Sequence, residues 1–280
     1  MSYAALRRMA QVCALAAISS SLYAVDGVIL IDQNHALAGN ITPGDTPGFP
    51  VTISQPGSYR LSSNLTVPDS NTTAIQITAD HVTIDLNGFA IIGPTVCNGS
   101  PALCPPNAQG IGINADNGPS QPGPRGIRIF NGTVRGMGST GIFITGVGSQ
   151  IERVTADSNA GGGFLVAGSV IESTATRNGT FGIFAVIVRD SFATDNHDIG
   201  IQLDGSGGVG TGNVASFNGS HGISSPNATV TANTAVRNVG FGISAVCPST
   251  IISNTIVSNT AGSITTNGAG CVLATNGTRP

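Results

Sequence analysis

The chain has 280 residues, a formal net charge of -3 and only 9% charged residues, against roughly 25% in an ordinary soluble domain. Because 40% of the residues are hydrophobic and so few are charged, neither a disordered chain nor a long solvated helical surface is expected. All eleven basic residues are Arg, which excludes lysine chemistry, and no basic surface indicates a nucleic-acid partner.

Residues 1–24 have the pattern of a secretory signal peptide. Arg7 and Arg8 precede an apolar stretch that runs to Ile18, and mostly small residues follow up to Ala24. We therefore expect cleavage after Ala24 and export to the periplasm, the cell surface or the medium. No later segment reaches the roughly 18 apolar residues that a membrane span requires. The remainder, residues 25–280, is predicted to form one domain.

Four cysteines remain once Cys13 leaves with the signal peptide, and an even number suits an oxidising compartment. We predict two disulfides, Cys97 with Cys104 and Cys247 with Cys271. A zinc site of four cysteines is the alternative, but such sites have tighter spacing within each cysteine pair.

The second half of the chain repeats a pattern anchored on asparagine. The repeating residues are 19, 18, 22, 20 and 21 positions apart, namely Asn159, Asn178, Asn196, Asn218, Asn238 and Asn259. Small or apolar residues stand eight and three positions before each Asn, and a Gly, or Ser in the last case, stands four positions after it, followed by an apolar residue. This spacing is typical of one solenoid coil, and the register predicts inward-facing columns of side chains.

Earlier coils are less regular but keep the alternation of apolar and polar residues that is typical of strands, at 75–77, 82–84 and 111–113. Two insertions, residues 93–110 and 115–126, are predicted as loops between them. Each insertion falls within the solenoid, so we include both in the single domain together with an N-terminal cap.

Helical solenoids have repeats of about 33 residues or more and a different composition. The sequence therefore predicts an all-β, single-stranded parallel β-helix with coils of about 18–22 residues. Successive coils should stack about 4.8 Å apart. Identical side chains then lie above one another, so the Asn amides can form a hydrogen-bonded ladder along the axis.

The segments Val82-Thr83-Ile84-Asp85-Leu86-Asn87-Gly88 and Ile129-Phe130-Asn131-Gly132-Thr133-Val134, with the Gly-Ile turns, resemble the right-handed parallel β-helix proteins of the pectate-lyase-like superfamily. The resemblance covers roughly residues 50–272 and implies the right-handed form. Members include lyases, hydrolases, epimerases and phage tailspikes, so the resemblance identifies the fold and not the activity.

The densest polar cluster of the sequence is Asp195-Asn196-His197-Asp198, which is similar to the Asp-Pro-His-Asp motif of β-helix alginate C5-epimerases. By that resemblance His197 transfers a proton, and Asp195 and Asp198 orient it or hold a cation. The match is incomplete, because Tyr59 is the only tyrosine after the signal peptide and lies far away in the sequence. The structural alternative is an Asp-rich turn around a ladder Asn.

A lyase or epimerase also needs a cation to neutralise the uronate, and Arg177 is the candidate. Arg177 and Asp195 share the position just before the ladder Asn in adjacent coils, so the alternative role for Arg177 is a stacked ion pair with Asp195. Hydrolysis is disfavoured, since the Asp-Asp pair and the lysine of polygalacturonases are missing. We predict no cofactor and no obligatory metal.

A column of outward-facing residues suggests a binding surface. Two positions beyond the turn Gly of four successive coils stand Phe143, Leu165, Phe184 and Gln202, which we call the outward track. Sugar rings could lie on such a flat apolar strip, unless a loop covers it, for example residues 95–109.

Together these features predict an exported β-helix scaffold that contacts polysaccharide without catalysis. A polyuronate epimerase or lyase centred on Asp195, His197 and Asp198 is the alternative, and an assembly or adhesion module is the third. The sequence indicates no oligomeric state.

Overall fold

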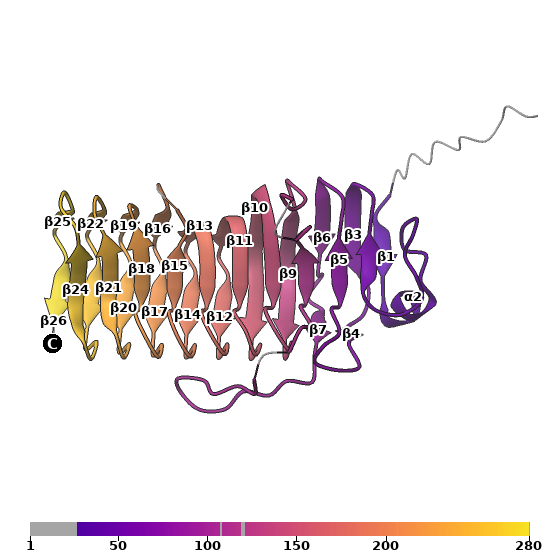
Figure 1. Ribbon diagram of the computed structural model, residues 1–280, viewed down its shortest axis with the longest axis horizontal. Helices are drawn as coiled ribbons and strands as arrows, with labels where there is room; N and C mark the ends of the chain where they lie inside the picture. The colour runs from indigo at the N-terminus through magenta and orange to yellow at the C-terminus, as the bar shows by residue number, and fades with distance from the viewer. Residues whose placement is uncertain (1–26, 107, 119–120, 206, 280) are drawn as a thin grey trace, which may run out of the picture.

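The computed structural model describes residues 27–106, 108–118, 121–205 and 207–279, so the predicted signal peptide lies outside the described residues. Figure 1 shows one elongated stack of coils that runs from β1 (Ile29–Ile31) to β26 (Gly277–Arg279). All pairings between named strands are parallel, which confirms the predicted all-β parallel β-helix.

Each coil supplies strands to three sheets in turn, which we number in chain order. Sheet 1 contains β2 (Val51–Ile53), β5 (Ile75–Ile77), β8 (Ile113–Ala115), the first parts of β10 (Ile142–Asp157), β11 (Phe164–Ile171) and β13 (Ile183–Arg189), then β15 (Ile201–Leu203), β18 (Ile223–Pro226), β21 (Phe241–Val246) and β24 (Gly262–Asn267).

Sheet 2 contains β1, β3 (Gly57–Leu61), β6 (Val82–Asp85), the first part of β9 (Arg128–Arg135), the middle of β10, the last parts of β11 and β13, then β16 (Val209–Thr211), β19 (Thr229–Thr231), β22 (Thr250–Ile252) and β25 (Val272–Ala274). Sheet 3 contains β4 (Leu65–Thr66), β7 (Ala90–Ile92), the last parts of β9 and β10, then β12 (Thr174–Thr176), β14 (Phe192–Thr194), β17 (Val214–Ser216), β20 (Thr234–Val236), β23 (Thr255–Val257) and β26.

The core is a set of columns in which each sheet buries one kind of side chain. Sheet 1 buries large apolar residues at the position after the turn Gly, namely Ile142, Phe164, Ile183, Ile201, Ile223 and Ile243. Sheet 3 buries a residue three positions before each ladder Asn, namely Ala156, Ala175, Ala193, Ala215, Ala235 and Ile256, of which only the last is not alanine. β-branched residues fit a pleated, buried surface, and the small alanines let sheet 3 lie close to the other two sheets.

The predicted asparagine ladder is formed at the turn between sheet 3 and sheet 1. The Nδ2 of each Asn donates to the Oδ1 of the Asn in the next coil, at 2.8 to 3.0 Å, from Asn159 through to Asn259. Each Oδ1 also accepts the backbone N–H of the Asn before it, as between Asn178 and Asn196 at 3.1 Å. The buried amides are therefore satisfied by one another and by backbone carbonyls.

A second ladder, which the sequence analysis missed, lies at the turn between sheet 2 and sheet 3. Its members are Asn213, Asn233, Asn254 and Asn276, joined by amide hydrogen bonds of 3.0 Å. Ser173 and Ser191 fill the same position in earlier coils, where Ser191 donates its N–H to Asn213 Oδ1 at 3.0 Å. Both corners that flank sheet 3 are thus fixed by side-chain hydrogen bonds.

The residue before each Asn of the first ladder has a left-handed backbone, for example Arg177 with φ 51° and Asp195 with φ 58°. Non-glycine residues pay roughly 1–2 kcal/mol for this conformation. The following Asn offsets that cost, because the turn brings its amide into the ladder.

The N-terminal end of the stack is covered by α2 (Gln33–Ala38), as Figure 1 shows. The Asp32 carboxylate caps this helix by accepting the N–H of His35 at 2.8 Å, and this hydrogen bond lowers the pKa of Asp32. Ala36 of the helix is buried against the core.

Replacing Asn196 with Ala tests the ladder. Asn196 is fully buried, and its loss leaves the N–H of Asn178 without its acceptor and removes one of the two acceptors of Asn178 Nδ2. We expect the free energy of unfolding to fall by at least about 2 kcal/mol, measured by denaturant titration. The control is Thr229→Ala, because Thr229 is exposed on sheet 2. This substitution should change the free energy of unfolding by less than about 0.5 kcal/mol. Equal effects of the two substitutions would rule out a stabilising ladder.

Candidate functional site

The first insertion connects β7 to β8 and folds back along the turns between sheet 3 and sheet 1. Thr95 donates its N–H to the carbonyl of Gly136 at 2.8 Å, and Ala108 donates to Gly138 at 2.7 Å. Further along, Ala102 donates its N–H to the carbonyl of Asp195 at 2.9 Å. The insertion therefore lies against several coils beside the ladder.

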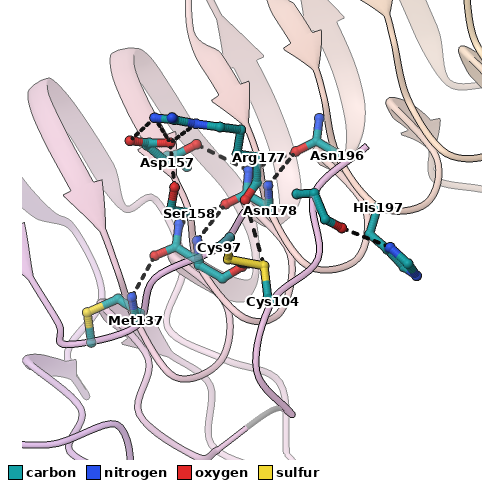
Figure 2. Close-up of a disulfide and its surroundings, with 12 residues drawn as sticks. Cys97, Cys104, Met137, Asp157, Ser158, Arg177, Asn178, Asn196 and His197 are labelled. Atoms are coloured by element: carbon teal, nitrogen blue, oxygen red, sulfur yellow. Dashed lines mark hydrogen bonds and ion pairs between the residues drawn. A yellow bond between two sulfur atoms is a disulfide. The ribbon is translucent and has the colours of Figure 1, made fainter. Parts of the chain in front are cut away.

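Both predicted disulfides are formed, Cys97 with Cys104 and Cys247 with Cys271. The first closes the tip of the insertion directly over the ladder, because the Sγ of Cys104 lies 3.7 Å from the carbonyl oxygen of Asn159 and 3.8 Å from that of Arg177. Figure 2 shows this disulfide next to the turns that carry Arg177 and Asn178. The second disulfide joins the segment after β21 to the start of β25.

The insertion binds two of the residues predicted to be catalytic. His197 is exposed, but its Nδ1 lies 2.9 Å from the carbonyl oxygen of Ala102, to which it donates a hydrogen. Asp195 accepts a hydrogen bond from the Ser100 hydroxyl and holds Ala102 through its backbone. These polar groups therefore hold the inserted loop against the coils.

Arg177 does not pair with Asp195, contrary to the prediction from their shared position. Its guanidinium makes a two-pronged ion pair with Asp157 of the preceding coil, with Nη2 2.9 Å from each carboxylate oxygen. Figure 2 shows the Arg177 side chain extending toward Asp157 and away from His197. The Asp195 carboxylate instead accepts a hydrogen bond from the Ser100 hydroxyl of the inserted loop.

The four residues predicted to be catalytic are thus neighbours along the ladder but have different partners. Asp198 is exposed and donates its backbone N–H to Thr180 at 3.0 Å. A hollow of about 480 Å³ lies beside His197, bordered by Ser100, Leu103 and Val239. Among these lining residues His197 is the one titratable side chain, and the Ser100 hydroxyl beside it is bonded to Asp195.

The outward track forms as one column on sheet 1. Phe143 is in register with Leu165, Leu165 with Phe184, and Phe184 with Gln202. All four side chains are half-buried and face outward between buried neighbours. Among the described residues of the insertion, 93–106 and 108–110, none forms a hydrogen bond with a residue of the outward track.

A second outward column, which the sequence analysis missed, continues the apolar surface. It consists of the residues just before the turn Gly, Phe181, Ile199, His221 and Phe241, and we call it the entry column. Their carbonyls accept the N–H of the turn Gly one coil earlier, which places them in register. The Phe181 and Phe184 rings are 5.9 Å apart, so the two columns meet there. These residues can be found in the sequence as the position before each turn Gly. Strand alternation, however, does not predict whether a side chain in a turn points inward or outward.

The entry column is itself ordered by contacts between its members. The His221 and Phe241 rings are 5.9 Å apart, and His221 Nδ1 accepts the N–H of Phe241 at 3.0 Å. Gly162 stands in the column one coil before Phe181, and a side chain there would meet the Phe181 ring. Each of the four side chains is half-buried, so one face of each remains open to solvent.

Within the described residues, no group of three or more His, Cys, Asp or Glu side chains is placed to hold a metal ion. The same part of the chain has no helix that is both long and apolar enough to cross a membrane.

A family model described as "Right handed beta helix region" matches residues 109–278. This match covers more than half of the chain, so the chain belongs to the right-handed β-helix family, and the predicted resemblance is confirmed. No curated protein matched the sequence.

Several solved structures share the fold. The A-module of Azotobacter vinelandii mannuronan C-5 epimerase AlgE4 is 14% identical with a TM-score of 0.51, over 75% of this chain and 72% of that one. The AlgE6 A-module is 15% identical with a TM-score of 0.50, over 75% and 71%. The Dettilon tailspike protein gp208 is 15% identical with a TM-score of 0.50, over 80% and 59%. At these identities the likeness shows the fold alone.

Replacing Cys97 and Cys104 together with Ser tests how the insertion is held. Opening so short a loop removes roughly 2 kcal/mol of closure free energy, so the Ala102 amide should exchange hydrogen faster. The Asn178 and Asn196 amides bond within the ladder and should keep their protection. The matched control replaces Cys247 and Cys271. Unchanged exchange at Ala102 would mean that hydrogen bonds alone hold the loop.

Proposed function

We propose that the chain is an exported β-helix scaffold that binds polysaccharide on the outward track. The observation that carries the proposal is the unbroken column of Phe143, Leu165 and Phe184, which are partly exposed on a regular sheet. Exposed contiguous apolar surface in soluble proteins marks interaction sites. The two disulfides and the absence of a membrane-spanning helix in the described residues agree with export.

A sugar chain suits this surface for geometric and chemical reasons. The apolar face of a pyranose ring packs on aromatic and aliphatic side chains, and its hydroxyl groups need hydrogen-bond partners around that contact. Amides stand in the same column on both sides of the apolar part, Asn114 before Phe143 and Gln202 after Phe184. The Asn114 amide donates to Gln76 at 2.8 Å, which orders this polar end.

The epimerase or lyase alternative has weaker support. His197 and Asp195 already bond to the inserted loop, and Arg177 is paired with Asp157. Mannuronan is named for two of the structures that share the fold, but a likeness in fold does not carry an activity over to this chain. Assembly is the third possibility, in which another protein would cover the outward track.

Proton NMR of polysaccharides mixed with the protein separates the three possibilities. Broadened glycan lines without new signals support binding, whereas new unsaturated, epimerised or reducing-end signals would replace the proposal with an enzyme. His197→Ala would then be the decisive variant. Spectra unchanged across a panel of neutral and uronic polysaccharides would favour assembly.

Replacing Phe143 and Phe184 together with Ala should weaken glycan retention roughly thirtyfold, because each lost stacking contact costs about 1 kcal/mol. Affinity electrophoresis through glycan-containing gels measures the effect. Phe192→Ala is the matched control, since Phe192 is 52% exposed but lies on sheet 3. Far-ultraviolet circular dichroism of all variants should match the original protein. Retention that survives the double substitution would remove the track as the binding site.

A further inference from the structure

We infer that the ligand is an uncharged, extended polysaccharide that lies along the solenoid axis over both the outward track and the entry column. This inference rests on the proposed function and adds the class of glycan and the length of the site. Two independent features carry it, the continuity of the apolar surface and the distribution of charge around it.

The apolar surface passes from one column to the other without a break. It follows the outward track from Phe143 to Phe184, crosses to Phe181 at a ring separation of 5.9 Å, and continues through Ile199 and His221 to Phe241. Coils in a β-helix are about 4.8 Å apart, so the surface is roughly 24 Å long. Only an extended chain can contact both ends at once.

The strands of sheet 1 carry no charged residue in the described chain, from β2 to β24. The acids nearest to the surface border it: Asp116 directly follows β8, Asp198 precedes Ile199, and Asp204 directly follows β15. Asp116 is fixed by the Thr145 hydroxyl at 2.8 Å. A polyuronate would therefore meet negative charges at the borders of the site and no arginine within the strands of sheet 1.

Two arginines in the turns before sheet 1 have other partners. Arg177 is bound to Asp157, and the Arg237 guanidinium lies 5.5 Å from the centre of the Phe217 ring. Both belong to turns before sheet 1 and not to its strands. A carboxylated glycan would lose water from its charges without gaining either of these arginines as a partner, which costs free energy, whereas hydroxyl groups can bond to the partly exposed Gln202 amide.

Pairs of glycans that differ only in their carboxyl groups test whether the site prefers an uncharged ligand. Alginate and polygalacturonate are each compared with the same polymer after reduction of its carboxyl groups to hydroxymethyl groups, together with uncharged glucans, mannans and galactans. We expect at least one uncharged polymer to be retained about tenfold more strongly than any uronate, with little change as sodium chloride rises. Stronger retention of an untreated uronate through Phe143 and Phe184 would overturn the inference and leave the proposed function standing.

Introducing a cation should change this preference. Gln202→Arg places a positive charge within the track, and retention of the unreduced uronates should rise about tenfold. Gln150→Arg is the matched control on sheet 2, away from the surface, and should leave retention unchanged. An equal gain in both variants would indicate nonspecific attraction and contradict the assigned site. If no polysaccharide is retained by the unaltered protein, the proposed function and this inference both fail.

The length of the site is tested with Phe241→Ala. Its ring lies at the far end from Phe143, so the variant should weaken retention of polymers severalfold and leave short oligosaccharides bound at Phe143 and Phe184 unaffected. Equal retention of polymers by the variant and the original protein would confine the site to the outward track.

Discussion

The hydrogen bond between asparagine amides of successive coils is the interaction on which the remaining structure depends. A buried amide is costly unless both its donor and its acceptor are satisfied, and the ladder satisfies them with a copy of the same residue one coil away. This requirement fixes the register between coils. Side chains that follow the Asn at a constant distance, such as Phe164 and Ile183, must then stack.

Because the ladder fixes the register of the buried side chains, it also fixes the register of the outward-facing side chains. The same constraint that aligns the buried column of sheet 1 aligns the outward track, since adjacent residues of a strand face opposite sides. A surface that is flat and regular over many coils thus follows from the packing of the core. The outward positions are free to differ, and they change from amides through aromatic residues to serines along one column.

The first ladder and the outward track could be predicted from the sequence because each occupies a position with a constant distance from a repeated Asn or Gly. The second ladder was harder to detect, since Ser173 and Ser191 interrupt the series before Asn213. The entry column has mixed chemistry, so Ile199 and His221 do not look alike in the sequence although their backbones are in register. The position of the inserted loop could not be predicted from the sequence, because nothing within residues 93–110 indicates that Ala102 bonds to Asp195 and His197.

The Asp195 to Asp198 turn illustrates why polar clusters are ambiguous in a solenoid. A turn beside a ladder needs a left-handed residue and exposes its neighbours, which favours Asp and His for reasons of backbone geometry alone. The inserted loop then uses the same groups as anchors. Sheet 1 has the opposite character, because its strands carry no charge and its outward-facing apolar residues, Phe143, Leu165 and Phe184, are partly exposed. The described surface therefore separates the polar groups that fasten the loop and the coils from the apolar strip that is free to bind a partner.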